Sequence, residues 1–285
     1  MRDSLLSLFQ GTLVGAVIGA AIAEGGEPGL NQPARLLART DAIVASGEAI
    51  ARSGHLDRPD IPLAQTPFCL ESVAACFPLM LWFHDDRDRL QESLLHVAEI
   101  GQFPVDLRGD LLAVGFAIAR MLSAQFNPSQ IVPQLIDDLE GMEDGGAIDR
   151  LIAIQSLLAD GATLDAAKLH LGASRHSRAG TAIALAWYCF LTTPEDVSLT
   201  VRRASQTGDR APLSGLIAGG LSGADNGCIG IPLGWRSALP PETSDRLMSL
   251  ATQLWAAWSG VCDFDREGQL DEIPAVAAPR AIRSR

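Results

Sequence analysis

A histidine followed by three aspartates is the densest group of chemically capable side chains in this 285-residue sequence. His84 is followed by Asp85, Asp86 and Asp88. Oxygen-rich clusters of this kind can bind Ca²⁺, but the segment lacks the glycine and the terminal glutamate of a calcium-binding loop. Aspartate is also a preferred residue just before a helix, where its carboxylate accepts a backbone N–H. We therefore expect this group to cap a helix that begins near Arg87.

The other candidates for catalysis or metal binding have no supporting pattern. His170 and His176 flank Ser174 and Arg175 in a polar stretch that we interpret as a loop, and their spacing is not that of metal ligands. The acidic residues between 137 and 144 are typical of a solvated helix end. The sequence contains neither a Gly-x-Ser-x-Gly nucleophile elbow nor a Gly-x-x-x-x-Gly-Lys phosphate loop. These motifs therefore give no support to nucleophilic hydrolysis or nucleotide binding.

The overall charge and the cysteine content restrict the partners and the compartment. A net charge of −12 excludes a general nucleic-acid binder, which needs a basic surface. The five cysteines include no Cys-x-x-Cys pair, so we expect free thiols in a reducing cytoplasm. The stretch from Leu5 to Ala23 is almost long enough to cross a bilayer. It lacks the basic leading region of a signal peptide, so we expect a buried core helix, with a membrane helix as the alternative.

Helical periodicity dominates the chain, and no segment shows the alternation of a strand. We expect an all-α fold with a single compact multi-helix domain over residues 1–262 and a loosely ordered tail over residues 263–285. After the apolar helix, the expected helices are Pro33–Ser53, Leu70–Phe83, Arg87–Gly101, Leu107–Gln125, Pro128–Leu139, Ala147–Ala159, Thr163–Leu171, Arg178–Leu191, Pro194–Thr207, Ala211–Asn226 and Pro241–Ser259.

Two of these helices carry glycines at regular spacing. The helix over Ala211–Asn226 contains Gly215, Gly219, Gly220 and Gly223, and the first helix contains glycines at positions 11, 15 and 19. A glycine inside a helix costs about 1 kcal/mol relative to alanine. Several on one face are therefore explained best by another backbone that comes close. We predict that the two glycine-bearing helices pack against each other.

The glycine-rich segment also resembles a motif of the ADP-ribosylglycohydrolase family, which includes the dinitrogenase-reductase-activating glycohydrolases and J1-type crystallins. In that family Gly-Gly-Asp-Thr-Asp-Thr precedes an Ala-Gly-x-x-x-Gly-Ala helix, a further Gly, Ile-Pro and Trp. The matching residues here are Ala218-Gly219, Gly223-Ala224, Gly227, Ile231-Pro232 and Trp235. The glycines of the first helix resemble the family's opening motif, and Thr40-Asp41 resembles the start of its Thr-Asp-Asp-Thr motif. The resemblance implies the family's all-helical fold and, in active members, a pair of Mg²⁺ or Mn²⁺ ions held by the acidic motifs.

The sequence departs from the family at the positions that would hold those ions. Arg210 and Pro212 stand where the family has two metal-binding aspartates, with Asp209 at the preceding glycine. Ala20 and Ala42 replace two further aspartates of the motifs. In matching positions only Asp41, and Glu27 in the loop after the first helix, keep acidic oxygens.

These departures predict a metal site that has been lost, because hard cations need several oxygen ligands. We expect no metal cofactor and a catalytically inactive relative with a binding, regulatory or structural role and an unknown protein partner. The alternative is a weak or altered hydrolase that keeps a partial Mg²⁺ or Mn²⁺ site and uses Asp41 and Glu27.

The vestigial pocket expected from the resemblance comprises Glu27, Asp41, Asp209 and Arg210. A guanidinium binds phosphate through paired hydrogen bonds without any metal, so Arg210 could hold an anionic ligand such as ADP-ribose. Alternatively, Arg210 pairs with Asp209 or Asp41, or faces solvent.

Overall fold

The computed structural model describes residues 4–25, 33–53, 69–142, 146–173 and 177–260. All regular structure in these residues is helical, which confirms the expected all-α fold class. The elements are α1 (Leu5–Ala23), α2 (Pro33–Ser53), α3 (Leu70–Ala74), α4 (Phe77–Trp82), α5 (Arg87–Ile100), α6 (Val105–Leu122), α7 (Ile131–Leu139), α8 (Ala147–Ala159), α9 (Leu164–Ala173), α10 (Arg178–Thr192), α11 (Val197–Ala204), the short 3₁₀ helix η3 (Gly208–Arg210), α12 (Ala211–Gly230), α13 (Leu233–Ala238) and α14 (Pro241–Ser259).

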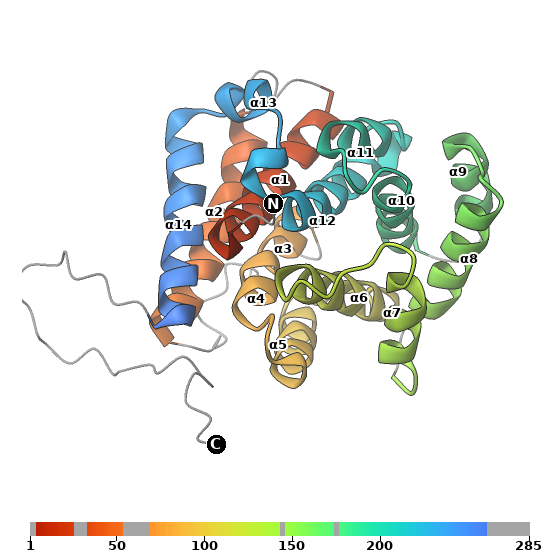
Figure 1. Ribbon diagram of the computed structural model, residues 1–285, viewed down its shortest axis with the longest axis horizontal. Coiled ribbons are helices and arrows are strands. Elements are labelled where there is room, and N and C mark those ends of the chain that lie inside the picture. Colours follow the sequence, from red (N-terminus) through yellow and green to blue (C-terminus); the bar gives the residue numbers. More distant parts are fainter. Residues whose placement is uncertain (1–3, 26–32, 54–68, 143–145, 174–176, 261–285) are drawn as a thin grey trace, which may run out of the picture.

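Helices α1 and α12 form the centre of the fold and run antiparallel, as the glycine spacing predicts (Figure 1). A Cβ added at Gly219 would lie 2.1 Å from the carbonyl oxygen of Gly15, and one added at Gly19 would lie 2.1 Å from that of Gly215. Only glycine permits such a close approach of two helix backbones. The C-terminal end of α1 is thereby fixed against the N-terminal end of α12.

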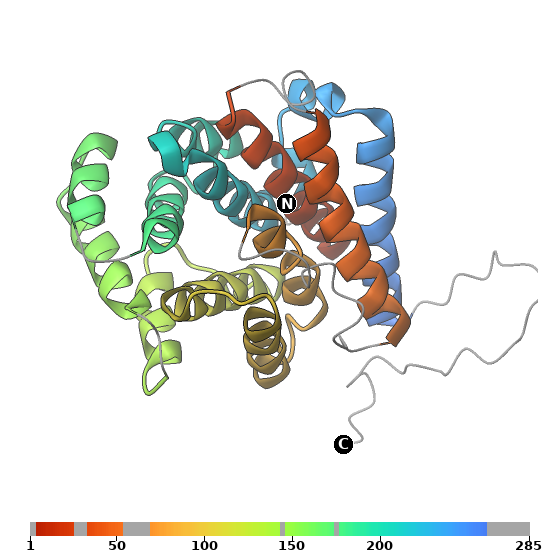
Figure 2. The same cartoon turned by 180° about the vertical axis from the view of Figure 1, so that it is seen from behind.

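The other helices are arranged around this central pair. Helices α2 and α14 cover one side of it and pack against each other, with Leu250 of α14 seated over Gly47 of α2. Helices α10 and α11 flank α12, and α8 and α9 lie beyond α10 at the opposite edge from α14 (Figures 1 and 2). Helices α3 to α7 close the remaining side.

Burial of α1 bears on the membrane alternative. The helix is long and apolar enough to cross a bilayer, but 67% of its most apolar window is buried inside the fold. Helices α12, α14 and α2 provide that cover. Burial of this extent is typical of a core helix, because a membrane helix keeps apolar side chains for lipid contact.

Several helix boundaries differ from those expected. The expected helix over Leu70–Phe83 is two helices, α3 and α4, because Pro78 lies in the first turn of a new helix, where a missing N–H costs nothing. Helix α11 begins at Val197 rather than Pro194, since the Asp196 carboxylate accepts the Leu199 N–H at 2.9 Å. Helix α13 was not expected. The tail over residues 263–285 lies outside the described residues.

A buried ion pair ties α6 to α8. The Arg150 guanidinium donates to both carboxylate oxygens of Asp110, at 2.9 and 2.7 Å, and both side chains are almost fully buried. Gly180 of α10 covers the pair, and a Cβ there would lie 3.1 Å from the Arg150 guanidinium carbon. Because the two charges satisfy each other inside the core, we treat this pair as structural.

Candidate functional site

The resemblance motifs meet at one end of the central helix pair. Ala20 lies in the last turns of α1, and the neighbouring Gly19 touches Gly215 near the start of α12. Ala23, one turn further along α1, would lie 2.6 Å from a Cβ at Gly215. Helix α2, which carries Ala42, also contacts α1. The structure therefore brings the three motif-bearing segments together, but both alanine positions are buried and apolar.

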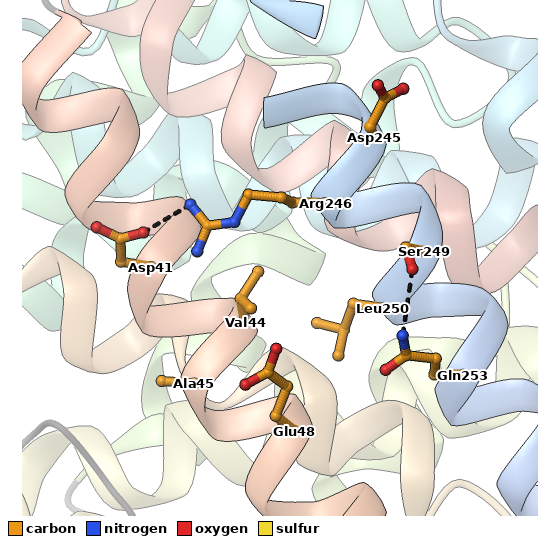
Figure 3. A pocket seen from close by; sticks show the side chains of 9 residues that line it. All are labelled: Asp41, Val44, Ala45, Glu48, Asp245, Arg246, Ser249, Leu250 and Gln253. Atoms are coloured by element: carbon orange, nitrogen blue, oxygen red, sulfur yellow. Dashed lines mark hydrogen bonds and ion pairs between the residues drawn. The ribbon is translucent and has the colours of Figure 1, made fainter. Parts of the chain in front are cut away.

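Asp41 points away from this junction. Its carboxylate accepts a hydrogen bond from the Arg246 guanidinium of α14 at 2.7 Å, and its side chain is 53% exposed. It lies at one end of a surface groove of about 500 Å³ between α2 and α14. Figure 3 shows Asp41 and Arg246 joined across the groove, with Glu48 further along it and Leu250 on the α14 side. The retained acidic group of the Thr-Asp motif is thus neutralised by an arginine.

Asp209 and Arg210 lie together in η3, the short helix that immediately precedes α12. The Asp209 carboxylate pairs with Arg178 of α10 at 2.9 Å, and Arg210 approaches the same carboxylate at 3.8 Å. The guanidinium of Arg210 also lies beside Gly172 of α9. In the described part of the chain, no ion pair joins Asp41 to either residue. The expected pairing of Arg210 with Asp209 is therefore present, and the pairing with Asp41 is not.

The remaining predicted site residue, Glu27, lies outside the described residues. Glu24, an acidic residue that the sequence analysis did not single out, is among the described residues. Glu24, at the C-terminal end of α1, forms an ion pair with Arg39 of α2, and both side chains are buried. Arg35, one turn earlier in α2, reaches the same carboxylate at 3.4 Å from an exposed position. A signal for Arg39 was available, because it occupies the apolar stripe formed with Leu36 and Ile43.

The described residues do not fit the pair of divalent cations that the resemblance implies. Among residues 4–25, 33–53, 69–142, 146–173 and 177–260, no three His, Cys, Asp or Glu side chains are grouped so that they could hold a metal. Glu24, Asp41 and Asp209 each face an arginine instead. Hard divalent cations need several oxygen ligands in one place, and these described carboxylates are not grouped in that way.

The cluster that begins at His84 is structural, as expected. Asp86 caps α5 by accepting the Arg89 N–H at 3.3 Å. The His84 ring lies 5.6 Å from Phe9 and 4.6 Å from Trp258, and one ring nitrogen is 2.6 Å from the Leu81 carbonyl oxygen. Burial lowers the pKa of His84, although that hydrogen bond and a nearby carboxylate oppose the shift. A neutral ring packed between aromatic side chains joins the end of α14 to α1.

The two other histidines considered as metal ligands are His170 and His176. His170 lies within α9, inside the helix expected over Thr163–Leu171. Its counterpart, His176, lies outside the described residues. Trp187 and Tyr188 are buried in α10 and pack in the core.

The described residues form an all-helical domain built on two helices that touch through glycines. A family model for ADP-ribosylglycohydrolases matches residues 33–263. The chain therefore belongs to the ADP-ribosylglycohydrolase family. The matched region begins at α2, so the relation of α1 to the family's opening motif rests on its packing against α12.

Comparison with solved structures supports the same fold. One match, described as an ADP-ribosylglycohydrolase-related protein complex, has a TM-score of 0.61 and 18% sequence identity. The alignment covers 89% of this chain and 97% of that chain, so the likeness extends over nearly the whole domain. No curated protein sequence matches the chain.

Proposed function

We propose that this chain is a catalytically inactive member of the ADP-ribosylglycohydrolase family with a binding, regulatory or structural role. The observation that carries the proposal is the replacement of metal-binding chemistry by arginine ion pairs. Ala20 and Ala42 provide no oxygen ligand, and Asp41 and Asp209 are each held by a guanidinium. Hydrolysis of the family type requires several carboxylates that are free to bind cations. Its free cysteines suit a protein of the reducing cytoplasm.

Metal content and hydrolysis test this proposal directly. The purified full chain is equilibrated with Mg²⁺ or Mn²⁺, desalted and analysed by elemental mass spectrometry. The same preparation is assayed for release of ADP-ribose from an ADP-ribosylated protein, beside an active family member as a positive control. We expect well below one equivalent of metal and no release above the no-enzyme rate. Two equivalents of metal, or release that chelation abolishes, would contradict the proposal and favour the alternative hydrolase.

The binding role is proposed to involve an anion at η3. Arg178 and Arg210 share one carboxylate, that of Asp209, so this surface carries an excess positive charge. The Arg210 side chain is partly exposed, and its contact with Asp209 is long for a hydrogen bond. A phosphate-bearing ligand such as ADP-ribose would gain charge-assisted hydrogen bonds there without a metal.

Isothermal titration of ADP-ribose into the full chain tests the ligand. We expect binding that is independent of Mg²⁺ and at least tenfold weaker in Arg210→Gln. The matched control is Arg246→Gln, which removes an ion-paired arginine from the α2–α14 groove and should leave the affinity unchanged. Absence of heat at millimolar ADP-ribose, or equal losses in both variants, would refute an anion site at η3.

A protein partner is the second form that a binding role can take. Affinity capture with the full chain, followed by mass spectrometry, tests for one. A partner lost in Arg210→Gln but kept in Arg246→Gln would point to η3 as the contact surface. If no protein is captured specifically, a protein partner is contradicted and the anion remains the only proposed ligand.

A further inference from the structure

Glu24 and Arg39 form a buried ion pair at the end of the central helix pair where the motif-bearing helices α1 and α2 meet. Arg39 is only 1% exposed and the Glu24 side chain only 7%. Removing a guanidinium and a carboxylate from water carries a large desolvation penalty, which only a well-placed opposite charge can offset. The Glu24–Arg39 pair is therefore unlike the surface salt bridge Arg35–Glu24, in which the arginine is 61% exposed.

The pair lies beside two of the positions at which motif aspartates are replaced, Ala20 and Ala42. The Glu24 backbone N–H bonds to the Ala20 carbonyl at 3.1 Å, so Glu24 lies one helical turn after Ala20 on the same face of α1. Arg39 lies three residues before Ala42, which places those two residues on the same face of α2. The ion pair thus joins the two helix faces on which the family's opening and Thr-Asp-Asp-Thr motifs would present aspartates.

The charge of Arg39 matches the electrostatics of this place. The C-terminal end of a helix carries partial negative charge, and the last turn of α1 contains no basic residue of its own. Arg39 supplies that positive charge from α2. Its Nε and Nη1 atoms are buried without a hydrogen-bond partner, so Glu24 is the counter-ion on which the guanidinium depends. A divalent cation at the same junction would be repelled by the guanidinium.

We infer that Arg39 is a built-in cation that fills the position of the lost metal site, with Glu24 as its counter-ion. This inference rests on the proposed loss of metal binding and gives its structural replacement. The pair holds the ends of α1 and α2 together through an internal charge and keeps exogenous cations out. Arg39 is accordingly a positioning residue, and it organises the junction without touching a substrate.

Thermal unfolding of matched variants tests the inference. Arg39→Met leaves the buried Glu24 carboxylate with only the exposed Arg35 as its counter-ion, and we expect a fall in Tm of about 5–8 °C. Arg35→Met removes the exposed arginine that contacts the same carboxylate, and we expect a change below about 2 °C. The double variant Glu24→Gln/Arg39→Met removes both charges and should recover part of the loss, because no uncompensated charge remains.

Chemical rescue provides a readout that a merely structural residue would not give. Arg39→Ala leaves a cavity beside Glu24, and millimolar methylguanidinium should raise its Tm by several degrees. The wild type and Arg35→Ala should show no rise. If Arg39→Met does not fold, rescue of Arg39→Ala and recovery in the double variant still decide the matter. Absence of rescue, together with equal effects of the Arg39 and Arg35 variants, would overturn the inference.

These outcomes are distinguishable from failure of the proposed function. Stoichiometric Mg²⁺ or Mn²⁺ in the wild-type protein would contradict the proposed function itself. A metal-free protein whose stability is insensitive to Arg39 would contradict only the inference. Mg²⁺ that raises the Tm of wild type would contradict both, because the built-in cation should exclude it.

Discussion

Substitution of Gly219 by alanine is the most direct test of the contact at the centre of the fold. The added Cβ would lie 2.1 Å from the carbonyl oxygen of Gly15 and 3.1 Å from the Cα of Gly19. Real Cβ atoms do not approach other heavy atoms to within 3.0 Å. Both obstructing atoms belong to the backbone of α1, so no side-chain rotation can relieve the overlap. The two helices have to move apart by about 1 Å to bring this contact to 3.0 Å.

The expected loss of stability follows from two opposing effects. Alanine in place of glycine in a helix interior contributes about 1 kcal/mol in favour of folding. Overpacking of a dense core costs about 1–3 kcal/mol, and more where the backbone itself has to shift. A gap of 0.5–1 Å between packed surfaces also forfeits roughly a quarter to a half of the dispersion energy there. We therefore expect a net loss of about 2–3 kcal/mol, equivalent to a fall in Tm of roughly 3–5 °C.

The assay is thermal unfolding followed by circular dichroism at 222 nm, with Gly172→Ala as the matched control. A Cβ at Gly172 would meet its nearest heavy atom, an Arg210 guanidinium nitrogen, at 3.7 Å, which is ordinary van der Waals contact. The same chemical change in α9 should therefore raise the Tm slightly, through helix propensity alone. A Gly219→Ala protein at least as stable as the wild type would refute the inferred backbone contact between α1 and α12.

Three further variants test other parts of the structure. Asp110→Asn removes the carboxylate charge that faces the buried Arg150 guanidinium and should cost about 3–5 kcal/mol in urea unfolding. Burial and the nearby Glu195 raise the pKa of Asp225 to about 6, so this carboxyl destabilises the fold as the pH rises from about 4 to 6. Asp225→Asn should therefore stabilise the protein at pH 7.5 by about 1 kcal/mol after allowance for solvent screening, but not at pH 4. Burial lowers the pKa of His84, so stability should fall as the pH drops below the ordinary histidine value, and His84→Gln should weaken that dependence in denaturation measured at pH 5.5 and 7.5.

The core of the fold could be predicted from the sequence because its determinants are local and periodic. Glycines at four-residue spacing in two helices are explained most simply by close packing of the two backbones, and the structure places those helices in contact. The boundary between α3 and α4 was predictable in principle from Pro78, which favours the first turn of a helix. Helix α13 was missed because its six residues include Gly234 and are too few to show periodicity.

The candidate site could be predicted only in part, since the sequence gives the identity of side chains but not their direction. The resemblance assigns Asp41, Asp209 and Arg210 to one site, and α1 does contact both α2 and the start of α12. The structure turns Asp41 outward to Arg246 and turns Asp209 toward Arg178. Both directions depend on residues of other helices that lie far away in the sequence. No local pattern could indicate that the acidic residues face different surfaces.

Arg39 shows which physical argument would have improved the prediction. A charged residue on the buried stripe of an amphipathic helix requires a counter-ion, because an unpaired guanidinium is among the most costly groups to bury. The loss of aspartates at Ala20 and Ala42 raises the complementary question of what balances the helix ends that remain. Glu24 is the acidic residue that closes α1, one turn after Ala20. An arginine on a buried helix face needs an acidic partner, and the motifs have lost the aspartates that could provide it. Together these two observations predict an ion pair between Arg39 and the acidic residue that remains at the end of α1. The same reasoning applies to any family member in which motif aspartates are replaced by alanine: an arginine on the buried stripe of the second helix should accompany the loss.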